Sequence, residues 1–217
     1  MTKTALITGA TSGIGKATAQ LFNREGIKLI LCGRRHERLQ ELQEEMDVPV
    51  HLLSFDVRDR EDVFRKIGDL PIAFEKIDIL INNAGNAHGL NLIQHGDPDD
   101  WDAMIDINVK GLLYVSKAVI PGMVERGNGH IINIGSIAGR DAYPRGNVYV
   151  ASKYAVDGLT QGMRQDLLGT GVKVGAVNPG LVETEFSEVR FKGDKEKAGK
   201  VYEGYRPLKP EDIADTI

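Results

Sequence analysis

The sequence predicts an α/β protein, a three-layer doubly wound Rossmann fold in which one parallel sheet carries helices on both faces. Two observations predict it. Short, nearly continuous apolar runs alternate with longer amphipathic segments along the whole chain. The runs lack the in/out alternation of a half-exposed strand, which is typical of strands buried on both faces of a parallel sheet.

The expected strands are apolar runs of four to six residues, and the expected helices are the amphipathic segments between them. The strands are Thr4–Thr8, Lys28–Cys32, Val50–Ser54, Ile77–Ile81, His130–Gly135 and Val172–Val177. The helices are Ile14–Arg24, Glu37–Met46, Arg60–Ile67, Pro98–Val124 and Val148–Leu168. We find no linker, repeat or low-complexity segment, so residues 1–217 are expected to form one domain.

Composition excludes several classes of protein. Lys plus Arg number 27 against 31 Asp plus Glu, a net charge of −4, which argues against a nucleic-acid or membrane-surface binder. The single cysteine, Cys32, cannot form an intramolecular disulfide, and the five histidines show no metal-ligand spacing. No apolar run approaches the roughly 20 residues of a membrane span, and the N-terminus shows no signal-peptide pattern. A cytoplasmic protein is expected.

A glycine-rich turn follows the first expected strand and opens the first helix. It reads Gly9-Ala10-Thr11-Ser12-Gly13-Ile14-Gly15. Glycine lets the backbone turn sharply and approach a pyrophosphate, which the free N–H groups of the helix N-terminus then bind. Its place inside a strand–turn–helix unit favours a dinucleotide site over a tight turn without ligand, which stays the alternative.

Two arginines, Arg34 and Arg35, follow the second expected strand where a carboxylate would select NAD. A guanidinium offers a fork of donors to a 2′-phosphate, so these residues favour NADP. The alternative is that they are solvated charges at the start of a helix.

Tyr149 and Lys153 lie four residues apart in an expected helix and therefore share one face. An ammonium near a phenol lowers its pKa, and Tyr149 could then act as an acid or base. Ser136 lies at the carboxyl end of the fifth expected strand, where open α/β sheets bind ligands. Taken alone, the Tyr–Lys pair could also be an amphipathic edge.

These motifs together resemble the short-chain dehydrogenase/reductase family. The resemblance rests on Thr8-Gly9-x-x-x-Gly13-x-Gly15, Asn82-Asn83-Ala84-Gly85, Asn108, Ser136, Tyr149-x-x-x-Lys153 and Asn178-Pro179-Gly180, in the family's order and spacing over essentially the whole chain. It implies that Tyr149 is the general acid or base, that Ser136 orients the substrate oxygen, and that Asn108 holds a water for a proton relay through Lys153. Lys153 would also bind the nicotinamide ribose.

The same resemblance implies further contacts to the cofactor. Residues near the adenosine half would be Asp56, Val57, Asn83, Ala84 and Gly85, and those flanking the nicotinamide would be Pro179, Gly180, Val182 and Thr184. Asp56 would accept a hydrogen bond from the adenine amino group.

A narrower resemblance concerns the substrate. The stretches 33–39, 121–126, 129–136 and 184–194 resemble the NADP-dependent 3-hydroxy acid dehydrogenases, a branch that includes serine and allo-threonine dehydrogenases and malonic semialdehyde reductases. A substrate carboxylate needs a cation, for which Arg190 and Arg145 are the candidates and Arg140 a third. The alternatives are a carbonyl reductase of 3-oxoacyl thioesters, sugars or other ketones, and an NADP-binding regulator without turnover.

Residues 182–209 form a glycine- and charge-rich segment too long for an ordinary connection. We expect either a lid that closes over substrate or a partly disordered segment, and a partner-binding loop is the alternative. Because Pro210 opens a helix so near Ile217, we expect the sequence to be truncated. The resemblance implies a further helix and a last strand beyond it. The resemblance also implies a homo-oligomer, dimer or tetramer.

Overall fold

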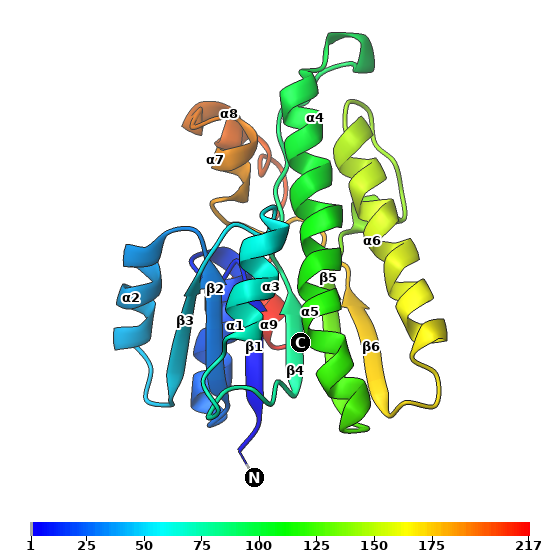
Figure 1. Ribbon diagram of the computed structural model, residues 1–217. Coiled ribbons are helices and arrows are strands. Elements are labelled where there is room, and N and C mark those ends of the chain that lie inside the picture. Colours follow the sequence, from blue (N-terminus) through cyan, green and yellow to red (C-terminus); the bar gives the residue numbers. More distant parts are fainter. Residues whose placement is uncertain (1) are drawn as a thin grey trace.

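Six parallel strands form the centre of the structure, a computed structural model that describes residues 2–217. The strands are β1 (Thr4–Thr8), β2 (Lys28–Gly33), β3 (Val50–Ser54), β4 (Ile79–Asn82), β5 (Gly129–Ile134) and β6 (Val172–Val177). Their order in the sheet is β3-β2-β1-β4-β5-β6, and every pair is parallel (Figure 1). The order runs outward in both directions from β1 and β4, so the expected ligand site lies at the carboxyl ends of these two strands.

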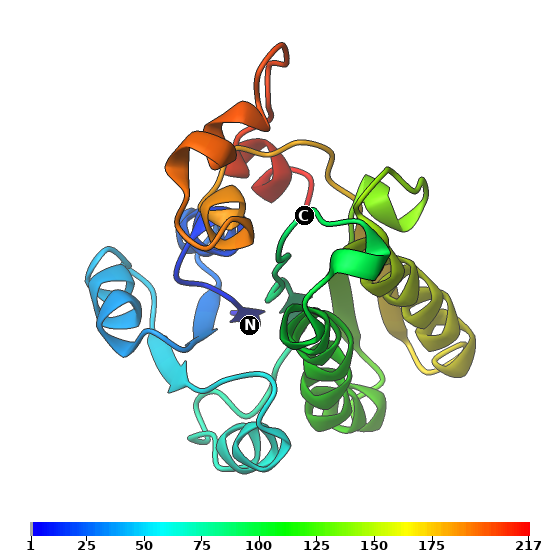
Figure 2. The ribbon, with the colours of Figure 1, turned by 90° about the horizontal axis from the view of Figure 1, so that it is seen from above.

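Helices cover both faces of this sheet, which confirms the predicted three-layer fold (Figure 2). One face carries α1 (Gly13–Arg24), α2 (His36–Glu44) and α9 (Pro210–Ala214). The other carries α3 (Arg60–Gly68), α5 (Leu112–Glu125) and α6 (Asn147–Asp166). Neighbouring residues on one strand pack into different cores, as period-two side chains must. Leu6 joins the core with α3 and α5, whereas Ile7 joins the core with α1 and α2.

The helical region expected over Pro98–Val124 consists of three continuous parts. They are α4 (Pro98–Ile105), a π-helical turn η2 (Asp106–Gly111) and α5. Asp97 begins α4 by accepting a hydrogen bond from the Asp99 amide at 3.0 Å, with Pro98 in the first turn, where its missing N–H costs nothing. The π-turn carries Asn108 and faces its side chain into the interior.

Strand boundaries differ by one or two residues from those expected. β4 begins at Ile79 rather than Ile77. Just before it, the Thr4 amide of β1 donates to the Asp78 carboxylate at 2.9 Å, and the Ile77 carbonyl accepts a hydrogen bond from the Arg126 guanidinium at 2.7 Å. β5 covers Gly129–Ile134 rather than His130–Gly135, so Ser136 lies in the turn beyond the strand and caps a short 3₁₀ helix, η3 (Ile137–Gly139). A second 3₁₀ turn, η1 (Ile93–His95), precedes α4.

A buried polar network ties β4 and β5 to the helices behind them. The Asn82 amide donates to Asn133 Oδ1 and to Ser116 Oγ, each at 2.9 Å, and the Asn133 amide donates to Thr160 Oγ1 at 2.9 Å. Buried polar groups need such partners, and side chains on α5 and α6 supply them here. The network fixes the carboxyl ends of the two strands that border the ligand crevice.

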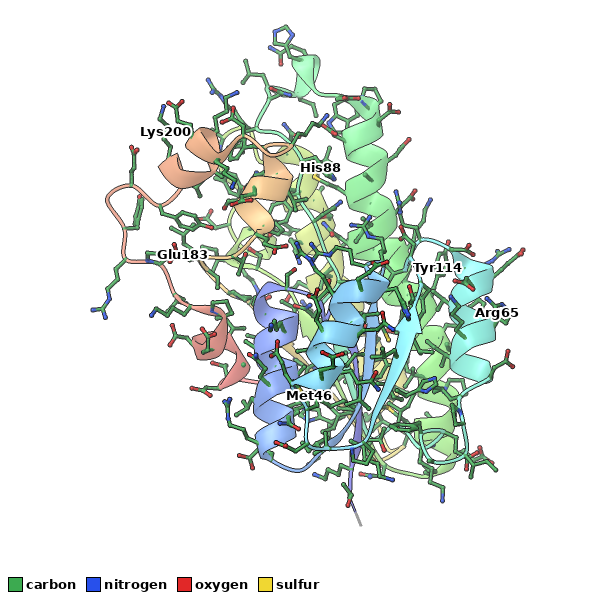
Figure 3. All side chains as sticks on the ribbon, turned by 90° about the vertical axis from the view of Figure 1, so that its left-hand side faces the viewer. Met46, Arg65, His88, Tyr114, Glu183 and Lys200 are labelled. Atoms are coloured by element: carbon green, nitrogen blue, oxygen red, sulfur yellow. The ribbon has the colours of Figure 1, made fainter. Side chains whose placement is uncertain are left out.

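Residues 182–209 fold into a compact unit above the carboxyl ends of the strands (Figure 1). Two short helices, α7 (Phe186–Arg190) and α8 (Lys195–Lys200), form its body. Its neck is closed by a parallel bridge between Val182 and Leu208, where the Glu183 amide donates to the Leu208 carbonyl at 2.9 Å. Figure 3 shows Glu183 at this neck and Lys200 at the far end of the segment.

Candidate active site

A pocket of about 760 Å³ opens at the carboxyl ends of the strands, beneath the 182–209 segment. Most of the residues expected from the sequence to form the site line it. They are Gly9, Thr11, Ser12, Gly13, Ile14, Arg34, Arg35, Asp56, Val57, Asn83, Ala84, Gly85, Ser136, Tyr149, Lys153, Pro179, Gly180, Val182, Thr184 and Arg190. The topology therefore brings together residues that are spread over about 180 positions of the sequence, as the switch-point rule predicts.

The glycine turn shows a backbone shaped for close approach. Gly13 adopts a φ of +51°, which favours glycine, and a Cβ at this position would lie 3.1 Å from Thr184 Cγ2. A Cβ at Gly15 would lie 2.5 Å from Asn83 Nδ2 and would collide with the Gly9 carbonyl. The N-cap residue of α1, Ser12, makes no side-chain cap hydrogen bond. First-turn amides of α1 are thus available to bind an anion such as a pyrophosphate.

Thr8 and Asn83 hold the turn against β4. The Thr8 hydroxyl accepts hydrogen bonds from the Asn83 and Ala84 amides, each at 3.0 Å. In return, Asn83 Nδ2 donates to the Thr8 carbonyl at 2.8 Å. These contacts cross the crevice between β1 and β4 and fix the distance between the two walls of the pocket.

Arginines and carboxylates meet at the β2 end of the pocket. Arg35 donates to Thr11 Oγ1 at 2.9 Å and to Ser12 Oγ at 3.1 Å, so its guanidinium lies on the glycine turn. Arg34 is 62% exposed and its Nη1 lies 3.8 Å from the Asp56 carboxylate. Both guanidinia therefore lie at the end of β2, where a 2′-phosphate is expected from the sequence.

The Asp56 carboxylate is held mainly by Arg58, with an oxygen–nitrogen distance of 2.7 Å. Burial alone would raise the pKa of Asp56, but hydrogen bonds and charge from Arg58, helped by Arg34, outweigh burial and lower it. Asp56 is thus an ionised hydrogen-bond acceptor at neutral pH.

Tyr149 and Lys153 project from one face of α6 into the pocket and are both buried. The Lys153 amino group lies 6.0 Å from the Tyr149 ring centroid and donates to the Ile134 carbonyl at 2.9 Å. Burial lowers the pKa of Lys153 to about 8. Ser136 borders the Tyr149 hydroxyl, and its hydroxyl also accepts a hydrogen bond from the Ala138 amide at 3.1 Å.

Several groups act on the pKa of Tyr149. Burial raises it above its ordinary value, while the hydrogen bond to Ser136 and the charge of Arg190 lower it. The Lys153 amino group is directed toward the Ile134 carbonyl. That Lys153 lowers the pKa of Tyr149 stays a prediction from the sequence.

Asn108 lies one layer behind the pocket wall. Its amide oxygen accepts from the Asn86 amide and its Nδ2 donates to the Asn86 carbonyl, each at 2.8 Å, with a further bond to Ser152 Oγ at 3.0 Å. A Cβ at Gly85 would lie 3.2 Å from Asn108 Oδ1 and 3.7 Å from the Lys153 amino group. Asn108 thus holds the loop after β4, and Gly85 leaves the space between it and Lys153.

Arg190 reaches from α7 to the tyrosines of the pocket. Its guanidinium carbon lies 5.3 Å from the Tyr149 ring centroid and 5.7 Å from that of Tyr143. Nη2 donates to the Tyr143 hydroxyl at 2.7 Å, and Nε donates to the Gly89 carbonyl at 3.2 Å. Phe186 packs on Tyr149 with ring centroids 5.7 Å apart. A cation and an apolar cover therefore lie beside the Tyr149 ring.

The other two candidate arginines do not line this pocket. Arg145 is exposed, has a φ of +67°, and lines a separate small pocket with His88 and Trp101. It precedes the first turn of α6, which begins at Asn147. Arg140 is 64% exposed and pairs with Asp157 at 2.8 Å.

Sequence reasoning missed Tyr143 and Glu185, which also line the pocket. Tyr143 holds Arg190, and Glu185 binds Arg35 at 3.0 Å. Both depend on partners 47 and 150 residues away, and no local pattern marks such pairs. The only signal available in the sequence was that Glu185 is an acidic residue within the 182–209 segment.

Within residues 2–217, no group of His, Cys, Asp and Glu side chains could hold a metal ion. No helix in this range is long and apolar enough to cross a membrane.

Comparison with known proteins gives a consistent picture. The family model described as short chain dehydrogenase matches residues 3–195. The chain is 51% identical over 213 residues to the NADP-dependent 3-hydroxy acid dehydrogenase YdfG of Salmonella typhi, covering 98% of this chain and 86% of that protein. It is 48% identical over 220 residues to sulfoacetaldehyde reductase 2 of Chromohalobacter salexigens, covering 100% and 87%.

A solved structure described as the closed form of serine dehydrogenase complexed with NADP⁺ superposes on this chain with a TM-score of 0.96. The two sequences are 48% identical, and the match covers 98% of this chain and 86% of that one. The Tyr–Lys pair, the glycine turn and the sheet order described above thus belong to a fold that is known to bind this dinucleotide in a similar protein.

Proposed function

This chain belongs to the short-chain dehydrogenase family, and from that premise we propose that it is an NADP-dependent oxidoreductase that interconverts a small 3-hydroxy acid and its 3-oxo form. The observation that carries the substrate class is the guanidinium of Arg190 beside Tyr149. The named relatives act on hydroxy acids or on an anionic aldehyde, and each such molecule carries an anion close to the reacting carbon.

The residues around the glycine turn fit NADP. Three features support the fit: the available first-turn amides of α1, the absence of side-chain atoms at Gly13 and Gly15, and the two guanidinia of Arg34 and Arg35 at the adenosine end. Asp56, Val57 and residues 83–85 would hold the adenosine, and Pro179, Gly180, Val182 and Thr184 the nicotinamide. NADP supplies the hydride acceptor, and the protein supplies position and electrostatics.

Tyr149 is proposed as the general acid and base. In oxidation its phenolate takes the proton of the substrate hydroxyl, and in reduction its phenol returns it. Ser136 orients the same oxygen, since it borders the Tyr149 hydroxyl. Lys153 lies within the pocket at a pKa of about 8, where it can hold ribose hydroxyls and exchange a proton near neutral pH. Asn108 holds the loop behind Lys153 and is proposed to support a proton relay.

Arg190 is proposed to bind the substrate carboxylate. Its guanidinium carbon is 5.3 Å from the Tyr149 ring, so an anion on Arg190 and an alcohol at the Tyr149 hydroxyl can belong to one small molecule. A 3-hydroxy acid places these two groups two carbons apart. Phe186, Val189 and several other residues of the 182–209 segment line the site, and we propose that the segment closes over substrate and excludes water.

The test is an initial-rate comparison of wild type and Arg190→Gln with NADP and NAD. The panel holds L-serine, allo-threonine, 3-hydroxypropionate and 3-hydroxyisobutyrate, with sulfoacetaldehyde and a 3-oxoacyl thioester in the reverse direction. Loss of a charge-assisted bond of roughly 1.5–3 kcal/mol should raise KM for the acids about 10- to 100-fold. Arg145→Gln is the matched control and should change KM less than two-fold.

Three results would speak against the substrate class. Arg190→Gln would leave KM for the acids unchanged, or wild type would turn over only the thioester, or only sulfoacetaldehyde. The last result would keep the anion site and replace carboxylate by sulfonate as its ligand. A homo-oligomer and a cytoplasmic location stay predictions from the sequence.

A further inference from the structure

Glu185, at the start of α7, lies across the pocket on two arginines of the adenosine end. Its carboxylate accepts a hydrogen bond from Arg35 Nη1 at 3.0 Å and from Arg38 Nη1 at 2.8 and 3.1 Å. Burial would raise the pKa of Glu185, but hydrogen bonds and charge from the two arginines outweigh burial and lower it. The ionised carboxylate of Glu185 is therefore hydrogen-bonded to Arg35, whose guanidinium borders the proposed 2′-phosphate site.

The donors of Arg35 are already shared among three partners. Nε and Nη2 donate to Thr11 Oγ1 at 3.3 and 2.9 Å, Nη2 also donates to Ser12 Oγ at 3.1 Å, and Nη1 donates to Glu185. A phosphate that takes two parallel hydrogen bonds from Arg35 must replace at least one of them. The hydroxyls of Thr11 and Ser12 can turn and donate to a phosphate, whereas an ionised carboxylate has no proton to give and repels it. Glu185 is therefore the partner that gives way.

The charge at this rim favours an anion. Arg34, Arg35, Arg38 and Arg58 contribute four positive charges, and Asp56 and Glu185 contribute two negative ones. The net charge of these six side chains is therefore positive with Glu185 in place, and it becomes more positive when the Glu185 carboxylate moves away from Arg35. Asp56 is held by Arg58 at 2.7 Å, so Glu185 is the carboxylate that faces the proposed phosphate on Arg35.

Resting on the proposed role of Arg35, we propose that Glu185 and the 2′-phosphate of NADP(H) compete for the Arg35 guanidinium, so that Glu185 limits the preference for the phosphorylated cofactor. With NAD(H), which lacks this phosphate, Glu185 keeps its place on Arg35. Glu185 is thus a specificity-determining residue at the cofactor site, contributed by a segment that also covers the substrate.

The test measures dissociation constants of NADPH and NADH for the full chain, by quenching of the single tryptophan or by calorimetry, without substrate. Removing one charge a few ångströms from a dianionic phosphate at the surface should tighten NADPH binding about three- to ten-fold in Glu185→Gln. NADH binding should change less than two-fold. Glu188→Gln, on the exposed face of the same helix, is the control and should leave both constants unchanged.

The same measurement in the Arg35→Gln variant distinguishes competition for Arg35 from a general repulsion between Glu185 and the phosphate. Arg35→Gln should weaken NADPH more than NADH, and Glu185→Gln added to it should tighten NADPH less than two-fold. The proposal is overturned if Glu185→Gln leaves the ratio of the two constants unchanged, weakens NADPH, or gives its full gain in the Arg35→Gln background. Because no substrate enters these titrations, their failure is distinct from failure of the substrate panel.

Discussion

Lys153 carries a charge that folding disfavours, and replacing it should stabilise the protein at neutral pH. The buried ammonium has its pKa lowered from 10.5 to about 8. Each pH unit between these two values corresponds to about 1.4 kcal/mol of preference for the neutral amine. Burying the charged form therefore costs about 3 kcal/mol below pH 8, and the cost disappears above pH 10.5, where the amine is neutral in both states.

Lys153→Met keeps the length of the side chain and removes the charge. The variant also loses the hydrogen bond to the Ile134 carbonyl, which offsets the gain by about 1 kcal/mol. We expect a net stabilisation of about 2 kcal/mol at pH 7, or roughly 4–8 °C in Tm for a chain of this size. Activity should be lost at the same time, because Lys153 lies in the proposed catalytic group.

The assay is urea unfolding of wild type and Lys153→Met at pH values from 7 to 9.5. The stability difference should be constant up to pH 8 and shrink above it. Lys117→Met, an exposed lysine on α5, is the control and should show no such pH dependence. Equal or lower stability of Lys153→Met at pH 7, or a gain that does not change with pH, would refute the reasoning.

Two further changes test the site. Tyr149→Phe removes only the proposed proton donor, so turnover should fall at least about 100-fold while the NADPH dissociation constant changes less than two-fold; near-normal rates would reject the assigned role. Gly15→Ala places a Cβ 2.5 Å from Asn83 Nδ2 and against the Gly9 carbonyl, so unfolding free energy should fall by about 1–3 kcal/mol, with weaker NADPH binding. Gly162→Ala, in open space on α6, should instead be neutral or stabilising by thermal melting.

The strands and the helices between them could be predicted because the hydrophobic pattern that marks each of them is local in the sequence. Six apolar runs mark strands that are buried on both faces, and each is a strand in the structure. Their ends were less certain, since they depend on distant partners. At the start of β4, for example, side chains bind the neighbouring backbone: Asp78 accepts from the Thr4 amide, and Arg126 donates to the Ile77 carbonyl.

The candidate-site residues also divide into those marked by a local motif and those that depend on distant partners. The glycine turn and the Tyr149–Lys153 pair lie in motifs of a few residues, and the fold carries them into one pocket. Arg145 lies outside this pocket, in the turn before α6, which begins at Asn147. Tyr143 could not be selected, because its importance comes from Arg190, a residue on another element.

Helix α7 joins two charged contacts, one at the proposed cofactor end of the pocket and one at the proposed substrate end. Its N-terminal neighbour Glu185 binds the arginines of the cofactor end, and its last residue, Arg190, binds Tyr143 at the substrate end. At 1.5 Å per residue, the axial distance between them is only about 7.5 Å. A rotation of this short helix that releases one contact changes the geometry of the other. By thermodynamic reciprocity, whatever factor the cofactor's phosphate applies to acid affinity, the acid applies to cofactor affinity.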